Sequence, residues 1–118
     1  MKTVTIHVVG FSYPDWSKRV PETYDILLDV RNFIGRGNKR KKGGASALRS
    51  KAIRDELMAK KGTQDCINYL AKKIVDLQKA KCNLVIVIGC KQGKHRSVTV
   101  ALALQEMFAS DVIYHYTK

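Results

Sequence analysis

Acidic residues are scarce in this sequence of 118 residues, which has 10 Asp and Glu against 22 Lys and Arg and a formal net charge of +12. So large an excess of positive charge on a small chain points to a polyanionic partner, of which nucleic acid is the simplest. The alternative is a basic surface with no partner of its own. The length suits one domain with its own core, so we expect residues 1–118 to form a single domain.

Cysteines are few, and long hydrophobic runs are missing. Cys66, Cys82 and Cys90 form an odd set without the spacing of a metal site, so we expect reduced thiols and neither a metal ion nor a cofactor. No apolar run approaches the roughly 20 residues of a membrane span, and the first residues, MKTVTIHVVG, lack the apolar region and cleavage site of a signal peptide. These absences predict a cytoplasmic protein without a membrane partner.

Only two prolines are present, and both lie in residues 12–23, which we therefore expect to form a loop. Four other segments predict β-strands. Residues 3–11 are rich in β-branched residues, and residues 83–89 are a continuous apolar run of the kind found inside parallel sheets. The other two predicted strands are residues 24–33 and 111–118.

Three further segments predict helices. Residues 45–61 are good helix formers, and we expect Gly62 to end this helix and Thr63 to cap the next one. Residues 97–109 are apolar nearly all round, which is typical of a helix packed on a sheet. The middle helix carries an apolar stripe at helical spacing, formed by Ile67, Leu70, Ala71, Ile74 and Leu77.

The predicted element order is therefore β-β-α-α-β-α-β, in an α/β fold. Residues 83–116 form a strand–helix–strand unit, so its two strands are expected to be parallel with a right-handed crossover. We predict a single three-layer-like domain with a small, mostly parallel sheet and a strand–phosphate loop–helix element.

Residues 35–44, GRGNKRKKGG, contain no apolar residue to bury and predict a mobile loop. Because this loop follows the second strand, we expect it at the edge of the sheet where the carboxyl ends of parallel strands meet. In the earlier loop, Tyr13 and Trp16 can stack on a base. The basic residues that we expect to contact nucleic acid are Arg36, Lys39, Arg40, Lys41, Lys42 and Arg49.

The segment GCKQGKHRS, residues 89–97, joins a predicted strand to the last helix. A helix N-terminus presents unpaired N–H groups and a partial positive charge, which together favour an anion. Gly93 lets the loop curl, Arg96 can bind a phosphate through two hydrogen bonds, and Ser97 can cap the helix. This segment therefore predicts a phosphate-binding loop.

A nucleoside triphosphatase is disfavoured as the explanation of this loop. The Walker A pattern needs G-x4-G-K-[ST]. Here only three residues separate Gly89 from Gly93, and Lys94 is followed by His95.

A cysteine-dependent phosphatase fits better, because its C-x2-G-x2-R-[ST] pattern is matched at every fixed position of residues 90–97. In such an enzyme Cys90 attacks phosphorus as a thiolate, Arg96 holds the phosphoryl oxygens and an aspartate such as Asp29 protonates the leaving group. Gly89 stands where these enzymes usually have histidine, which favours binding over catalysis. The plainer interpretation of Cys90 is a small residue at a buried strand end.

The loop also resembles a second pattern, found in the RapZ C-terminal domain family. VIGCKQGKHRSVTVA is similar to the GC-x-x-G-x-HRSV loop of that family. The segments FSY, DILLDVRNF, GTQDCINYL and HYTK resemble further landmarks of the family in the same order, so the likeness spans nearly the whole chain. Two segments differ: Lys91-Gln92 stands where the family usually has Thr-Gly, and NFIGRGNKRKKGG replaces a Pro-rich, histidine-bearing stretch.

The resemblance implies a module that senses an amino-sugar phosphate and binds a structured small RNA. It also implies that Asp29 and Arg31, in the second strand, complete the ligand pocket. The candidate ligand-binding residues are Asp29, Arg31, Cys90, Lys91, Gln92, Gly93, Lys94, His95, Arg96 and Ser97.

We therefore expect a protein that binds a phosphorylated ligand, either a sugar phosphate or a nucleotide, in residues 89–97, and RNA over its basic surface. One alternative is a cysteine-dependent phosphatase whose catalytic residues are Cys90, Arg96 and Asp29. Another is a small-molecule sensor or sequestering protein that binds no nucleic acid. Enzymatic activity is the less favoured interpretation, and self-association remains an option.

Overall fold

The structure is a computed structural model that describes residues 2–35 and 46–116. Its elements follow the predicted order β-β-α-α-β-α-β, with short 3-10 helices at Trp16–Lys18 and Val30–Asn32. The strands are β1 (Thr3–Gly10), β2 (Ile26–Asp29), β3 (Asn83–Cys90) and β4 (Asp111–Tyr114), and the helices are α1 (Lys51–Met58), α2 (Lys61–Gln78) and α3 (Arg96–Phe108).

The four strands form one sheet in the order β2-β3-β1-β4, and every neighbouring pair is parallel. The two central strands run side by side over their whole length, from Thr3 opposite Asn83 to Gly10 opposite Cys90. Both strands are buried through most of their length, which is why their sequences are nearly continuous apolar runs. The predicted α/β fold with a small parallel sheet is confirmed.

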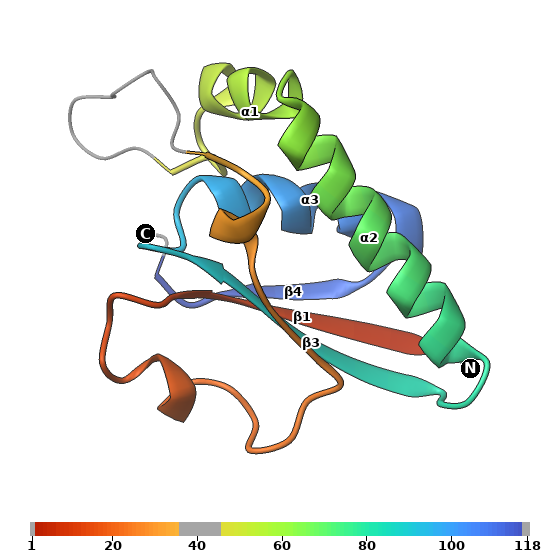
Figure 1. Ribbon diagram of the computed structural model, residues 1–118. Helices are drawn as coiled ribbons and strands as arrows, with labels where there is room; N and C mark the ends of the chain where they lie inside the picture. Colours follow the sequence, from red (N-terminus) through yellow and green to blue (C-terminus); the bar gives the residue numbers. More distant parts are fainter. Residues whose placement is uncertain (1, 36–45, 117–118) are drawn as a thin grey trace.

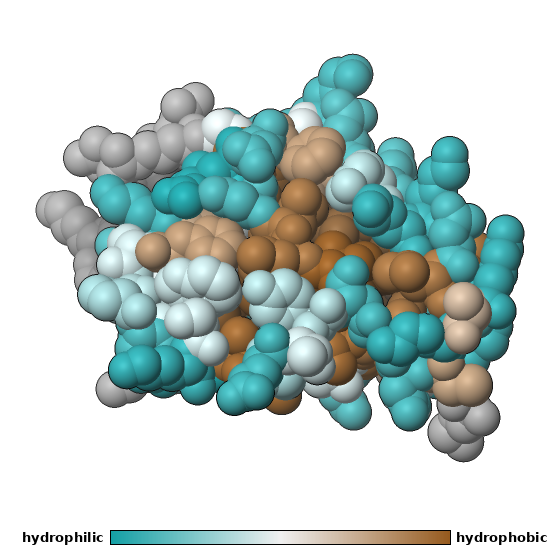
Figure 2. Space-filling view, turned by 60° about the horizontal axis from the view of Figure 1, so that its bottom comes forward, coloured by the Kyte–Doolittle hydropathy of each residue, from teal (hydrophilic) through white to brown (hydrophobic). Residues whose placement is uncertain are grey.

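The sheet separates two unlike layers (Figure 1). All three helices cover one face, while the segment between β1 and β2, residues 11–25, passes under the other face. A small second cluster forms there, in which Phe11, Trp16 and Tyr116 pack against Val9 and Val87. Figure 2 shows this side of the molecule, where hydrophobic residues gather in the middle of a hydrophilic rim.

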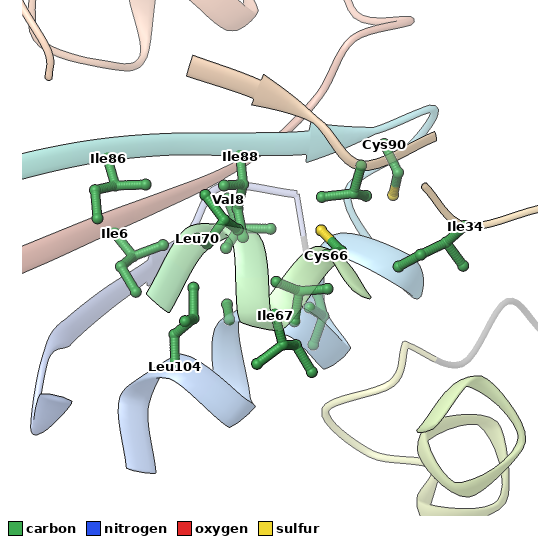
Figure 3. Close-up of a cluster of buried hydrophobic side chains, with 14 of the residues drawn as sticks. Ile6, Val8, Ile34, Cys66, Ile67, Leu70, Ile86, Ile88, Cys90 and Leu104 are labelled. Atoms are coloured by element: carbon green, nitrogen blue, oxygen red, sulfur yellow. The ribbon is translucent and has the colours of Figure 1, made fainter. Parts of the chain in front are cut away.

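The main core lies between the sheet and the helices (Figure 3). It consists of residues that are 7% exposed or less, among them Ile6, Val8, Ile86, Ile88, Ile67, Leu70 and Leu104. Full burial of each such side chain stabilises the fold by roughly 1.5–3 kcal/mol. Cys90, at the carboxyl end of β3, belongs to the same cluster, so the core reaches the start of the 90–97 loop.

The predicted second strand, residues 24–33, is too long. β2 ends at Asp29, because the Asp29 carboxylate accepts a hydrogen bond from the backbone N–H of Arg31 and the chain turns into a 3-10 helix. The last strand also stops early, at Tyr114. At Asp29 a local hydrogen bond therefore replaces a ladder that β-propensity alone would extend, whereas after Tyr114 one more bond to β1 forms, from the backbone N–H of His115 to the carbonyl oxygen of Val8.

The predicted role of Gly62 and Thr63 is wrong. The first helix ends at Met58, α2 starts at Lys61, and both residues lie inside its first turn. A Cβ atom on Gly62 would collide with the carbonyl oxygen of Phe33, so this glycine permits close packing and does not terminate a helix. Thr63 is fully buried, and its hydroxyl has no hydrogen-bond partner within the described residues.

The predicted helix at residues 45–61 is only eight residues long, from Lys51 to Met58. Ser50 caps it, because its hydroxyl accepts a hydrogen bond from the backbone N–H of Ile53. Within residues 2–35 and 46–116, no helix is long and apolar enough to cross a lipid bilayer.

Candidate functional site

All four strands are parallel, so their carboxyl ends meet at one edge of the sheet (Figure 1). The loop from β3 to α3 lies at this edge, together with the residues that follow the other strands. Of the predicted site residues, the structure brings Asp29, Arg31, Cys90 and Arg96 close together. The charge of Arg96 contributes to the low pKa of Asp29, and Arg31 interacts electrostatically with Cys90.

Residues 90–97 form a curled loop that we call the phosphate cradle. Its curl depends on Gly93, whose φ of 69° lies in the left-handed region that favours glycine. A Cβ atom there would also lie 2.7 Å from the carbonyl carbon and oxygen of Val9. Gly93 therefore lets the cradle turn tightly while it packs on the end of β1.

Several hydrogen-bond donors converge on the sulfur at the floor of the cradle. The Sγ atom of Cys90 lies 3.2 Å from the Oγ atom of Ser97, and the backbone N–H groups of Gly93 and Ser97 also donate to it. The floor is shielded from solvent, since Cys90 is 3% exposed and Ser97 is fully buried. This arrangement favours a negative charge at the centre of the cradle.

The pKa values of two buried cysteines are shifted in opposite directions. Burial raises the pKa of Cys66, in the same hydrophobic cluster, to about 12. Burial is also the largest influence on Cys90 and raises its pKa, but the hydrogen bonds from Ser97 and Gly93 and the charge of Arg96 together hold that pKa below its ordinary value. The cradle therefore stabilises an anion that burial alone would disfavour.

Asp29 and Arg31 form a bidentate pair beside the cradle. The Nε atom of Arg31 lies 2.9 Å from Oδ1 of Asp29, and its Nη2 atom lies 2.7 Å from Oδ2. The hydrogen bond from Arg31 lowers the pKa of Asp29 despite partial burial, so this carboxylate is ionised at neutral pH. Asp29 thus fixes the Arg31 guanidinium, which also lies over the ring of Phe11 at 5.7 Å.

Arg96 opens α3 and is half-buried. Its Nη1 atom donates a hydrogen bond of 3.2 Å to the carbonyl oxygen of Ile34. A cation at the first turn of a helix is unfavourable against the helix dipole, so its placement here suits a site that receives an anion.

The remaining cradle residues form its rim. Lys91 and Gln92 are exposed, whereas Lys94 and His95 are half-buried. The carbonyl oxygen of His95 accepts hydrogen bonds from the backbone N–H and the hydroxyl of Thr99, which fixes the start of α3.

The predicted basic residues Arg36, Lys39, Arg40, Lys41 and Lys42 lie outside the described residues. Residues close to both ends of that segment form hydrogen bonds with the cradle. Ile34 accepts the hydrogen bond from Arg96, and the backbone N–H of Ala47 donates to the carbonyl oxygen of Lys94 at 2.7 Å.

Close to this attachment, Ser46 is buried, and its hydroxyl has no hydrogen-bond partner in the described part of the chain. Arg49 is exposed on the same short turn. The turn is held by Arg54, whose Nη1 atom donates to the carbonyl oxygens of Ala47 and Leu48. The predicted contact residue Arg49 is thus near the cradle.

Residues 4–117 match the RapZ C-terminal domain. The chain belongs to this family. Its relatives include proteins named "Nucleotide-binding protein". The one from Bacillus pumilus (strain SAFR-032) is 31% identical, over 98% of this chain and 39% of that protein. The one from Nocardia farcinica (strain IFM 10152) is 29% identical, over 92% of this chain and 34% of that protein.

A third relative, the "Nucleotide-binding protein" of Acidothermus cellulolyticus (strain ATCC 43068 / DSM 8971 / 11B), is 32% identical over 84% of this chain and 32% of that protein. The RapZ C-terminal domain described here therefore spans between about a third and two fifths of the length of these curated relatives.

Two aromatic residues at the same edge were not among the predicted site residues, although they lie in the family landmarks FSY and HYTK. Phe11 directly follows β1, and Tyr116 lies two residues beyond β4. Tyr116 stacks on Tyr13, with ring centroids 4.2 Å apart and ring planes 8° apart. Their positions just after strand ends are the signal that could have found them, because every strand of a parallel sheet ends at the same edge.

Proposed function

We propose that this chain binds a phosphorylated ligand, a sugar phosphate or a nucleotide, in the phosphate cradle, and RNA over the basic surface around it, in the cytoplasm. The observation that carries the first part is the arrangement at the floor of the cradle, where the Cys90 sulfur lies 3.2 Å from the Ser97 hydroxyl at the start of α3 and within the field of Arg96. The lowered pKa of this buried thiol agrees with a positive potential at that point. The same positive potential can hold a phosphate group.

The shape of the cradle supports this proposal. The loop leads into the N-terminus of α3, and the charges of Arg96 and Arg31 both act on Cys90 at its floor. Arg31 is oriented in advance by Asp29, so little side-chain freedom is lost when an anion binds.

The RNA part of the proposal is supported by charge and by position. The predicted basic segment joins the rest of the chain through residues that are bonded to the cradle, namely Ile34 and Ala47. Arg49 and the exposed Lys91 add positive charge at the same edge. An RNA strand that reaches the cradle would therefore meet basic side chains close to it.

A second candidate function is phosphate-ester cleavage by Cys90, and the low pKa of this thiol favours it. The thiolate would form a bond to phosphorus while the ester oxygen leaves, and that oxygen would need a proton. Asp29, the candidate acid, is ionised and engaged with Arg31, so it has no proton to give at neutral pH. We therefore favour binding over cleavage.

Isothermal titration with inorganic phosphate and with a sugar phosphate tests the binding proposal. The wild type should bind both, and Arg96→Ala should weaken binding by roughly ten- to a hundred-fold, because a charge-assisted hydrogen bond contributes about 1.5–3 kcal/mol. Lys72→Ala, which removes an exposed charge from α2, is the matched control and should bind like the wild type. Equal binding by wild type and Arg96→Ala would rule out the cradle as the site.

A further inference from the structure

A parallel stack of side chains lies on the side of the sheet away from the helices. Tyr13 and Tyr116 stack at 4.2 Å, and the guanidinium carbon of Arg19 lies 4.8 Å from the centroid of the Tyr116 ring. Asp15 holds the stack together, since its carboxylate accepts hydrogen bonds from Arg19 at 3.0 Å and from the hydroxyl of Tyr116 at 3.1 Å. We call Tyr13, Tyr116 and Arg19 the aromatic shelf.

The aromatic shelf adjoins the phosphate cradle. After β1 the chain continues alongside the cradle, with the backbone N–H of Phe11 donating to the carbonyl oxygen of Cys90 at 2.9 Å. Ser12 donates twice to the carbonyl oxygen of Lys91, from its backbone N–H at 3.0 Å and its hydroxyl at 2.7 Å. Tyr13 follows directly, so its ring is tied to the strand end next to the cradle.

Packing against the small hydrophobic cluster explains the position of Tyr116 but not that of Tyr13. Tyr116 packs against the small cluster around Val9, Val20 and Val87, so its burial has a structural reason. Tyr13 is not part of that cluster and is half-exposed, with one face covered by Tyr116. A flat ring held in this way is a ready surface for a further planar group, because stacking on an aromatic side chain accepts any base.

We propose that the phosphate cradle and the aromatic shelf together bind a nucleoside monophosphate unit, with the phosphate in the cradle and the base stacked on Tyr13. This inference rests on the proposed phosphate site and adds the part of the ligand that lies outside it. A sugar phosphate would use the cradle alone, whereas a nucleotide would use both parts. The unit can come from a free nucleotide or from the 5′ end of an RNA strand, because both present the same phosphate monoester and base.

Matched ligands separate the shelf from the cradle in an equilibrium binding experiment. Uridine 5′-monophosphate carries a base where ribose 5-phosphate has its anomeric hydroxyl, and the wild type should bind the nucleotide about ten-fold more tightly. Tyr13→Leu should reduce the affinity for the nucleotide to that for ribose 5-phosphate and leave the latter unchanged, which also shows that the variant is folded. Tyr24→Ala, which removes an exposed ring just before β2, is the control and should keep the ten-fold preference.

The outcomes distinguish this inference from the function on which it rests. Equal affinity for both ligands in the wild type, or an undiminished preference in Tyr13→Leu, overturns the shelf while the phosphate site stands. Loss of all binding by both ligands overturns the phosphate site as well. Oligouridylates with a 5′-phosphate or a 5′-hydroxyl identify the source: tighter binding of the phosphorylated strand than of the free nucleotide assigns the site to RNA ends, and the reverse assigns it to free nucleotides.

Discussion

The role of Cys90 differs between a loop that only binds a phosphate ester and one that cleaves it. Its sulfur sits among donors from Gly93 and Ser97, and its pKa is lowered although the side chain is buried. A nucleophile needs that property, but an anion-binding loop produces it as well. Cleavage, unlike binding, also needs an acid that protonates the leaving group. The candidate acid, the carboxylate of Asp29, is already hydrogen-bonded to Arg31.

We predict that the wild type does not hydrolyse an aryl phosphate above background at any pH from 5 to 8. The reason is that ester cleavage needs both a thiolate and a proton donor for the leaving group. Cys90→Ser should then bind inorganic phosphate within about three-fold of the wild type, since the serine hydroxyl keeps a polar atom at the cradle floor. A steady-state assay checks this, and turnover that disappears in Cys90→Ser would establish the phosphatase instead.

The local conformation of the candidate site was predictable where its residues belong to one short motif. The C-x2-G-x2-R-S spacing of residues 90–97 predicts a curled loop at a helix start, and the structure has that loop. The contacts of Arg96 with Ile34 and of Tyr13 with Tyr116 were not predictable, because they join residues far apart in sequence. Such partners follow from strand order, which no local pattern specifies.

At the scale of elements, two histidines join the central strand β1 to the residues after the edge strand β4. Nδ1 of His7 lies 3.0 Å from Nε2 of His115, and the backbone N–H of His115 donates to the carbonyl oxygen of Val8. The ring centroids are 5.2 Å apart and the planes 8° apart, so the rings meet edge to edge through an N–H···N hydrogen bond. This bond needs one imidazole nitrogen without a proton.

Acid should therefore weaken the fold at this junction. Burial lowers the pKa of His7, and burial together with the charges of His7 and Arg19 lowers the pKa of His115. The unfolded chain then binds more protons than the folded one, so the free energy of unfolding is retained above about pH 6.5 and falls below it, by at most about 1.4 kcal/mol per pH unit for each proton.

Chemical denaturation at pH 5 to 8 measures this loss. The double variant His7→Asn/His115→Gln places amide groups near the same positions and cannot titrate, so its stability should change less with acid than that of the wild type. Identical pH profiles for the two proteins would show that the pair has no such role.

Elements were predictable in type and order, but less so at their ends. The apolar runs of β1 and β3 and the stripe on α2 reflect burial in the core, and burial dominates local preference. The ends depend on single contacts that sequence does not display, such as the approach of Gly62 to Phe33 or the turn at Asp29. Gly62, between two helical segments, therefore predicted the end of a helix, whereas in the structure it permits close packing on Phe33.

At the scale of the whole molecule, acidic residues are not spread evenly among the basic ones. Among the described residues, the ion pairs include six aspartates, five of which pair with a basic residue two to four positions away. The segment GRGNKRKKGG has no acidic residue. Surface pairs of this kind contribute little to stability, but they leave the excess charge concentrated elsewhere.

We predict that replacement of Arg36, Lys39, Arg40, Lys41 and Lys42 by alanine weakens binding of structured RNA and flattens its salt dependence. Each phosphate contact lowers log K against log salt by roughly 0.7 to 0.9, so five contacts account for a few units of slope. The preference among RNA sequences should not change, because phosphate contacts position a ligand and do not specify it. Filter binding from low to moderate salt measures both quantities.

Lys2→Ala/Lys72→Ala removes two exposed charges outside the cradle edge and is the control for charge loss alone. Its slope should stay close to that of the wild type. If the five-fold variant binds RNA with the wild-type affinity and slope, the basic segment takes no part in RNA binding.

We propose that the cradle holds a phosphate through the backbone at the start of α3, and amide correlation spectra recorded during a titration with inorganic phosphate test this proposal. We expect saturable shifts for the backbone amides of residues 91–97, largest at Gly93 and Ser97, and for the side-chain Nε of Arg96. Amides at the amino ends of the strands, such as those of Thr3 and Asn83, should not move. Saturable shifts elsewhere with none in residues 91–97, or no saturable shift at all, would contradict it.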